Sequence, residues 1–205
     1  EILEHQSPSS VLENALDVLH RFQTTATLEQ QRLPSGLLSE RNYFSFLVEK
    51  FAKRVTSDTE KQQHVADRFL FLADLLQKHR RMAIHGDFHP SNIYCADTSM
   101  TILDPEHMTL ASTEFDLVDL LESHLYPVDQ QLMRHLLHRA HTRFASGTSY
   151  EAWLLSCYSP VAAYRNLHRM GAVIASSDSL HPDALRQRKN LYRQQAIASL
   201  VTLRT

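Results

Sequence analysis

The sequence predicts a mainly helical fold with a small β element near the middle of the chain. Two observations support this prediction. Apolar residues recur at helical spacing before about residue 78 and again after about residue 113. Between these regions, three short apolar runs are separated by turn-forming residues, a pattern typical of very short strands. These runs occupy residues 82–84, 93–95 and 100–103.

The first predicted helix spans about residues 10–22. Ser10 and Glu13 have the spacing of a capping box, in which each side chain accepts a hydrogen bond from a backbone N–H group at the helix start. The apolar face that follows consists of Val11, Leu12, Ala15, Leu16, Leu19 and Phe22. The same periodicity predicts further helices over residues 40–55, 59–78, 115–126, 129–145, 150–170 and 183–205.

Composition excludes several classes of protein. Of 205 residues, 43% are apolar and 21% are charged, with a formal net charge of −2 and no basic face. We therefore expect neither nucleic acid nor a membrane as a partner. Cys95 and Cys157 form neither a disulfide framework nor a CxxC metal site. With no long apolar run and no signal peptide, a cytoplasmic location is expected.

Polar residues that can perform chemistry are concentrated in the predicted β element. Phosphoryl transfer requires a carboxylate that orients the attacking hydroxyl group, and hard oxygen ligands that hold Mg²⁺ against nucleotide phosphates. Asp87 and Asn92 lie five residues apart in one loop and can supply the carboxylate and one ligand. Asp104 follows the next predicted hairpin and can supply a second ligand. The complete group is His85, Asp87, His89, Asn92, Asp104, Glu106 and His107.

Three motifs resemble those of one enzyme superfamily. His85-Gly86-Asp87-Phe88-His89-Pro90-Ser91-Asn92 resembles the HGDxHxxN catalytic loop of the aminoglycoside phosphotransferase, choline kinase and fructosamine kinase superfamily. These enzymes are small-molecule kinases with the protein-kinase fold. Ile102-Leu103-Asp104-Pro105-Glu106 resembles the strand and D-x-E or D-P motif of the superfamily, and Phe115-Asp116-Leu117-Val118-Asp119-Leu120-Leu121 resembles its later D-L-A segment.

The resemblance implies that residues 1–205 form a protein-kinase-like large C-terminal lobe. This lobe would contain a catalytic loop at 84–95, a metal-binding hairpin at 100–107 and a helical remainder. No small-lobe sequence is visible before residue 10, so we expect that lobe to be missing here, and an upstream segment of a longer kinase and a second chain both remain open as its source. One departure concerns residues 108–114, which lack the glycine usually found there in the superfamily.

The resemblance also assigns roles to individual residues. Asp87 would be the catalytic base, and His89 would contact the γ-phosphate or support the loop. Asn92 and Asp104 would bind Mg²⁺ and, through it, ATP or another nucleoside triphosphate. His85 and Asp116 would support the catalytic loop rather than take part in chemistry.

The leading functional prediction is ATP- and Mg²⁺-dependent phosphorylation of a hydroxyl group on a small molecule. An amino alcohol, a sugar, a ketosamine and an aminoglycoside all remain open as acceptors. One alternative is a non-catalytic binding or regulatory module, or half of a two-chain assembly, with an apolar surface that favours self-association. Another is a metal-dependent phosphohydrolase, since Gly86-Asp87-Phe88-His89 matches the G-D-x-H start of that class, although no G-N-H-[DE] segment follows.

Overall fold

The computed structural model describes residues 8–28, 81–96, 99–123, 128–145 and 147–175, and isolated positions within 59–71 and 183–194. The chain divides into two compact units. The first contains residues 1–35 and 80–153, and the second contains residues 36–79 and 154–205. The predicted helices at 40–55, 59–78 and 183–205 lie outside the described residues, apart from these isolated positions.

The first helix, α1 (Pro8–Leu28), is longer at both ends than the sequence predicts. The capping-box prediction is wrong, because Ser10 lies inside the first turn of the helix rather than at its N-cap. Its neighbour Ser9 donates a hydrogen bond to Glu13 at 3.2 Å instead. The apolar stripe is largely as predicted, and its most deeply buried members are Leu12, Ala15, Leu16 and Leu19.

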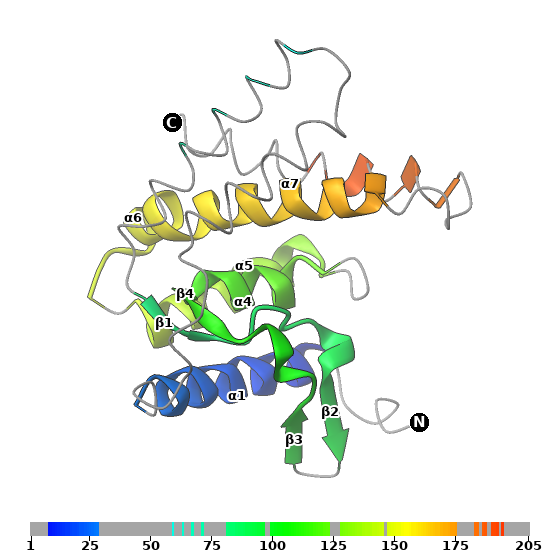
Figure 1. Cartoon of the computed structure of the whole chain (residues 1–205). Coiled ribbons are helices and arrows are strands. Elements are labelled where there is room, and N and C mark those ends of the chain that lie inside the picture. The colour runs from blue at the N-terminus through cyan, green and yellow to red at the C-terminus, as the bar shows by residue number, and fades with distance from the viewer. Residues whose placement is uncertain are drawn as a thin grey trace. The chain divides into compact units, whose positions relative to one another are not determined.

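The β element consists of two separate antiparallel pairs. Strand β1 (Arg81–Ile84) pairs with β4 (Thr109–Ser112), with Arg81 opposite Ser112 and Ile84 opposite Thr109. Strand β2 (Ile93–Ala96) pairs with β3 (Ser99–Ile102) and forms a ribbon that extends away from α1, β1 and β4 (Figure 1). Three of these strands were predicted, and β4 was not. Two single-turn 3₁₀ helices, η3 (Pro90–Asn92) and η4 (Pro105–His107), complete the connections.

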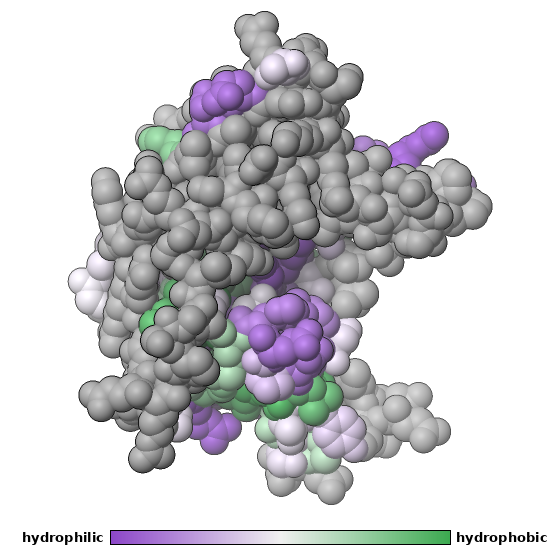
Figure 2. All heavy atoms as spheres, viewed as in Figure 1, coloured by the Kyte–Doolittle hydropathy of each residue, from purple (hydrophilic) through white to green (hydrophobic). Residues whose placement is uncertain are grey.

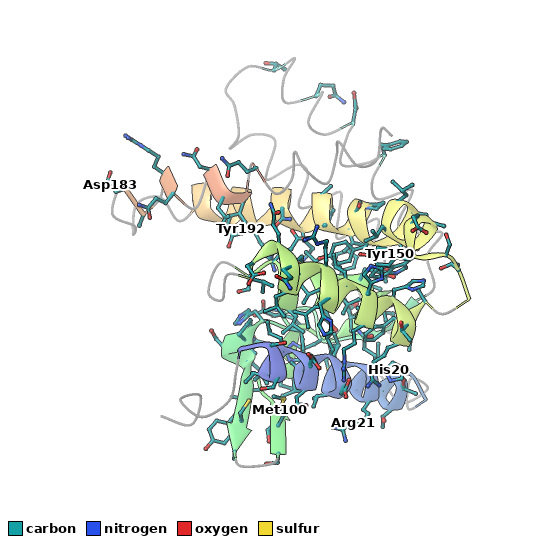
Figure 3. All side chains as sticks on the ribbon, turned by 180° about the vertical axis from the view of Figure 1, so that it is seen from behind. His20, Arg21, Met100, Tyr150, Asp183 and Tyr192 are labelled. Atoms are coloured by element: carbon teal, nitrogen blue, oxygen red, sulfur yellow. The ribbon has the colours of Figure 1, made fainter. Side chains whose placement is uncertain are left out.

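The core of the first unit forms around α4 (Glu114–Leu121), all of whose residues are buried. Helix α1 packs against β1, α4 and α5 (Gln130–Phe144), and side chains fill the space between α1 and α5 (Figure 3). Asp129 caps α5 by accepting hydrogen bonds from the backbone N–H groups of Gln131 and Leu132, both at 2.8 Å. The short helix α6 (Tyr150–Trp153) closes this unit.

Ion pairs join α1 to α5 along the outer edge of this core. Glu13 lies 2.9 Å from Arg139 and 3.1 Å from His135, and Asp17 lies 2.7 Å from Arg143. The three α5 residues are spaced by four, so that they face α1 on successive turns. These partly exposed contacts supplement the buried apolar stripe of α1, and the same helix contacts the loop after β1 through Phe22.

In the second unit, η5 (Leu154–Tyr158) is a π-helical segment and α7 (Ser159–Ala175) is a regular helix. The sequence predicted one helix over residues 150–170, whereas the structure has α6, η5 and α7 in succession. The first half of α7 is buried on all sides, from residue 159 to residue 166. Among the described residues, no helix combines the length and the apolar character needed to cross a membrane.

Candidate active site

The loop between β1 and β2 brings three of the predicted site residues into contact. A tight turn forms as the backbone N–H of His89 donates to the Asp87 carbonyl at 3.0 Å, and that of Asn92 donates to the His89 carbonyl at 2.9 Å. Pro90 suits the start of η3, because proline lacks the N–H that would be unpaired in a first helical turn. The turn therefore folds Asn92 back towards Asp87.

Asp87, His89 and Asn92 form the front of the site. The Asn92 side-chain amide donates to the Asp87 backbone carbonyl at 3.0 Å and to Asp87 Oδ2 at 3.2 Å. Nε2 of His89 lies 3.3 Å from the same Oδ2 atom. About a third of the Asp87 side chain and a quarter of the His89 side chain are exposed, at 37% and 26%. The carboxylate is thus oriented by its neighbours and still open to a ligand.

Asp116 holds the same loop from behind. Its carboxylate accepts hydrogen bonds from the backbone N–H groups of His85 at 2.8 Å and Gly86 at 2.9 Å, and from the Gln23 side-chain amide at 3.0 Å. Asp116 is completely buried. Burial raises the pKa of Asp116 to about 6, with a smaller rise from Asp119, while the hydrogen bonds to it act in the opposite direction.

His85 joins the loop to the turn that carries Asp104. Its buried ring lies edge-on to Phe22 and Phe88, with ring centroids 6.1 and 6.0 Å away. Nε2 of His85 lies 2.9 Å from the Leu103 carbonyl oxygen. Since a carbonyl can only accept, this nitrogen carries the proton and donates it. The backbone N–H of Leu103 also donates to the Asn92 carbonyl at 2.9 Å.

Gly86 makes a second contact between the loop and the η4 turn. Its φ of +83° is unfavourable for residues with a side chain, and a Cβ atom there would lie 2.5 Å from the His107 carbonyl oxygen. The turn itself begins with Asp104 in the left-handed conformation, at φ 59° and ψ 60°. Aspartate tolerates this conformation better than most residues do. The loop and the turn therefore lie in direct backbone contact.

The side chains of the η4 turn are exposed. Asp104, Glu106 and His107 all face solvent, and Glu106 and His107 lie 3.4 Å apart. Figure 2 shows hydrophilic surface beside hydrophobic surface in the region of the strands. The exposed apolar residues of this part of the chain are Tyr94 and Leu103. Within the described residues, no three His, Cys, Asp or Glu side chains gather closely enough to hold a metal.

Asn92 and Asp104 nevertheless carry oxygen atoms of the chemical type that binds magnesium. The Asn92 amide nitrogen is directed at Asp87, so its carbonyl oxygen faces away from that contact. Asp104 offers an exposed carboxylate on the neighbouring turn. Amide and carboxylate oxygens are the hard ligands that Mg²⁺ prefers, and Mg²⁺ commonly takes its remaining ligands from water and substrate phosphates.

The structure adds Gln23 to the residues predicted from sequence. Gln23 is completely buried on α1, where it continues the stripe formed by Leu12, Leu16 and Leu19. Glutamine at the end of an apolar stripe resembles an ordinary exposed helix position, and for this reason sequence analysis missed it. Its spacing of four from Leu19 was the available signal, because that spacing places it on the inward face.

Comparisons with known proteins agree with the motifs. Residues 1–153 match a family model described as phosphotransferase enzyme family. The crystal structure of choline kinase LicA from Streptococcus pneumoniae is similar, with a TM-score of 0.61 and 13% sequence identity. The alignment covers 93% of this chain and 64% of that chain, so the chain spans less than two thirds of the choline kinase. No curated protein matches the sequence. The predicted kinase-like fold is confirmed by the structural match.

Proposed function

The chain belongs to the phosphotransferase enzyme family, within the aminoglycoside phosphotransferase and choline kinase superfamily, and we propose that it transfers a phosphoryl group from ATP or another nucleoside triphosphate to a small molecule. The acceptor group is a hydroxyl. The observation that carries this proposal is the contact of Asp87 with both His89 and Asn92 in a loop that Asp116 holds from behind.

Asp87 orients the acceptor hydroxyl and takes its proton. As the bond from the hydroxyl oxygen to the γ-phosphorus forms, the bond from that phosphorus to the bridging β–γ oxygen breaks, and the nucleoside diphosphate leaves with the electron pair. Asn92 contributes to this step by holding Oδ2 of Asp87. His89 lies beside the same oxygen atom, and the family resemblance adds a contact between His89 and the γ-phosphate.

Asn92 and Asp104 would hold Mg²⁺ through the oxygen atoms described above. When bound, Mg²⁺ neutralises charge on the β- and γ-phosphates. The backbone contacts that tie the η4 turn to the loop would keep Asp104 at a constant position relative to Asp87. The choline kinase likeness makes an amino alcohol the first acceptor to test, followed by sugars, ketosamines and aminoglycosides.

An assay of nucleoside diphosphate release with Mg²⁺-ATP and this series of acceptors tests the proposal. Asp87→Asn should lower kcat by roughly 10²- to 10⁴-fold, because general bases typically contribute that much. Nucleotide affinity, measured by titration calorimetry, should stay nearly unchanged. Asp129→Asn is the matched control, since asparagine also caps a helix and the α5 cap is outside the site.

Three results would contradict the proposal. Near-normal turnover in Asp87→Asn would exclude the assigned base. Nucleotide binding without turnover across the acceptor series would favour a non-catalytic kinase-like module. Hydrolysis of a generic phosphate ester with Mn²⁺ and no nucleotide would favour the phosphohydrolase alternative.

A further inference from the structure

Gln23 occupies a position where an apolar side chain would be expected. It lies four residues after Leu19 on the inward face of α1 and is completely buried. Burying an amide is unfavourable unless it forms hydrogen bonds, and a leucine or methionine of similar volume would carry no such penalty. The Gln23 amide nitrogen donates to Asp116 Oδ2 at 3.0 Å and lies 3.4 Å from the Thr113 carbonyl oxygen. The donor end of the Gln23 amide is therefore directed at Asp116, with a longer contact to Thr113.

The Asp116 carboxylate depends on three N–H donors. His85 and Gln23 donate to Oδ2, and Gly86 donates to Oδ1. Two of these donors are backbone groups of the functional loop, and the Gln23 amide is a side chain that reaches the carboxylate from α1. Among the described residues, Asp119 on α4 is the titratable group whose charge acts on Asp116, and it disfavours the charged carboxylate, while His85 contacts Asp116 through its backbone N–H.

Protonation of Asp116 would disturb the loop. A neutral carboxylic acid carries an O–H donor on one oxygen, and both oxygens here face N–H donors. On Oδ2 the new donor would face the N–H groups of both His85 and Gln23, and on Oδ1 it would weaken the hydrogen bond from Gly86, so protonation would loosen the hold of Asp116 on the loop backbone. The pKa of Asp116 is raised to about 6 by burial even though these hydrogen bonds lower it, so the loss of one hydrogen bond would bring the pKa closer to neutral pH.

We propose that Gln23 is a positioning residue for phosphoryl transfer, which acts from α1 by keeping Asp116 charged and so keeps the His85 and Gly86 backbone fixed next to Asp87. This inference rests on the proposed function. It assigns an effect on the reaction to a residue that touches neither the acceptor nor the nucleotide.

The test compares Gln23→Met with the wild-type protein. Methionine keeps the volume of glutamine and removes the donor. In the wild type, kcat/KM should fall as the pH drops through about 6. In Gln23→Met the pH midpoint of this decrease in kcat/KM should rise by about one pH unit, since the loss of one hydrogen bond to a charged group corresponds to roughly that shift in pKa. Leu19→Met, on the same stripe of α1, is the control and should leave the pH profile in place.

Amide hydrogen exchange supplies a readout that does not require turnover. The His85 and Gly86 N–H groups should lose protection at pH 6.5 in Gln23→Met and keep it in Leu19→Met. Unchanged protection together with an unchanged pH profile would overturn the inference and leave the proposed function intact. Absence of phosphoryl transfer in the wild type would instead contradict the proposed function. If Gln23→Met does not fold, Gln23→Leu provides the same two comparisons.

Discussion

Two carboxylates next to the loop between β1 and β2 differ in burial, hydrogen bonding and backbone conformation. Asp116, behind the loop, is completely buried and accepts three hydrogen bonds. Asp104, on the η4 turn, is exposed and has a left-handed backbone. The comparison teaches that the same side chain serves two purposes here. The buried carboxylate organises backbone N–H groups, and the exposed one remains available to a ligand.

The largest effect on stability should come from the titration of Asp116. Its pKa is raised from 3.8 to about 6, so the native state binds more protons than the unfolded state between these values. The stabilising contribution is therefore complete below pH 3.8 and is lost as the pH rises through 6. Relative to Asp116→Asn, the free energy of unfolding of the wild type should fall by about 3 kcal/mol between pH 3 and pH 7. Denaturant titrations at several pH values measure this difference.

A difference between wild type and Asp116→Asn that stays constant with pH would show that Asp116 does not titrate in this range. The comparison between the two carboxylates would then lose its electrostatic basis, although the hydrogen bonds of Asp116 to the loop would still distinguish it from Asp104. The variant is informative even if it is less stable, because the prediction concerns the slope with pH and not the absolute value.

An intermediate effect is expected at the contact between the loop and the η4 turn. Gly86→Ala places a Cβ atom 2.5 Å from the His107 carbonyl oxygen at a φ of +83°. We expect a loss of roughly 1–3 kcal/mol in unfolding free energy and a clear loss of turnover, since the turn must move away from the loop. Gly147→Ala is the matched control, as no atom lies within 4 Å of its Cβ position. Equal stability of the two variants would argue against this contact.

The smallest effect on stability should occur at Asp104. Glycine at position 104 adopts the left-handed conformation without strain, which stabilises the folded state, but it also has more conformational freedom in the unfolded state, which destabilises the fold. Because these two effects oppose each other, the unfolding free energy of Asp104→Gly should change by less than about 1 kcal/mol. Affinity for Mg²⁺-ATP should nevertheless fall at least about tenfold, because a charged metal ligand is removed. Calorimetric titration measures this, with Glu106→Gln as a control on the same turn. Unchanged affinity in Asp104→Gly would remove Asp104 from the metal site.

The contact among Asp87, His89 and Asn92 could be expected from the sequence because it is local, whereas the roles assigned to these residues stay predictions. Asp87, His89 and Asn92 lie within six residues, and Pro90 favours the turn that brings them together. Asp116 was predicted as loop support from the family resemblance alone. Asp116 lies 30 residues after Gly86, so no local sequence pattern predicts the hydrogen bond between them, which depends on the pairing of β1 with β4.

The features that sequence analysis missed are those decided by tertiary packing. Strand β4 consists of Thr109, Leu110, Ala111 and Ser112, a run without the β-branched or aromatic enrichment of a typical strand. The spacing of Gln23 from Leu19 places it on the inward face of α1, but its partner Asp116 lies far along the chain, and the helical pattern contains no information about that partner. The π-helical segment at Leu154–Tyr158 also interrupts a stretch whose apolar periodicity predicts one continuous helix.

The pairing of β1 with β4 has a consequence for how this site can change during evolution. The segment 85–108 connects the end of β1 at Ile84 to the start of β4 at Thr109, and these two residues are paired in the β1–β4 sheet. The β2–β3 ribbon within this segment could lengthen or shorten without altering the register of β1 and β4. A single residue inserted between Thr109 and Asp116 would instead shift Asp116 by one position along α4 and turn its carboxylate away from the His85 and Gly86 backbone N–H groups. Insertions and deletions should therefore accumulate at the tip of β2–β3, while the spacing from β4 to Asp116 stays fixed.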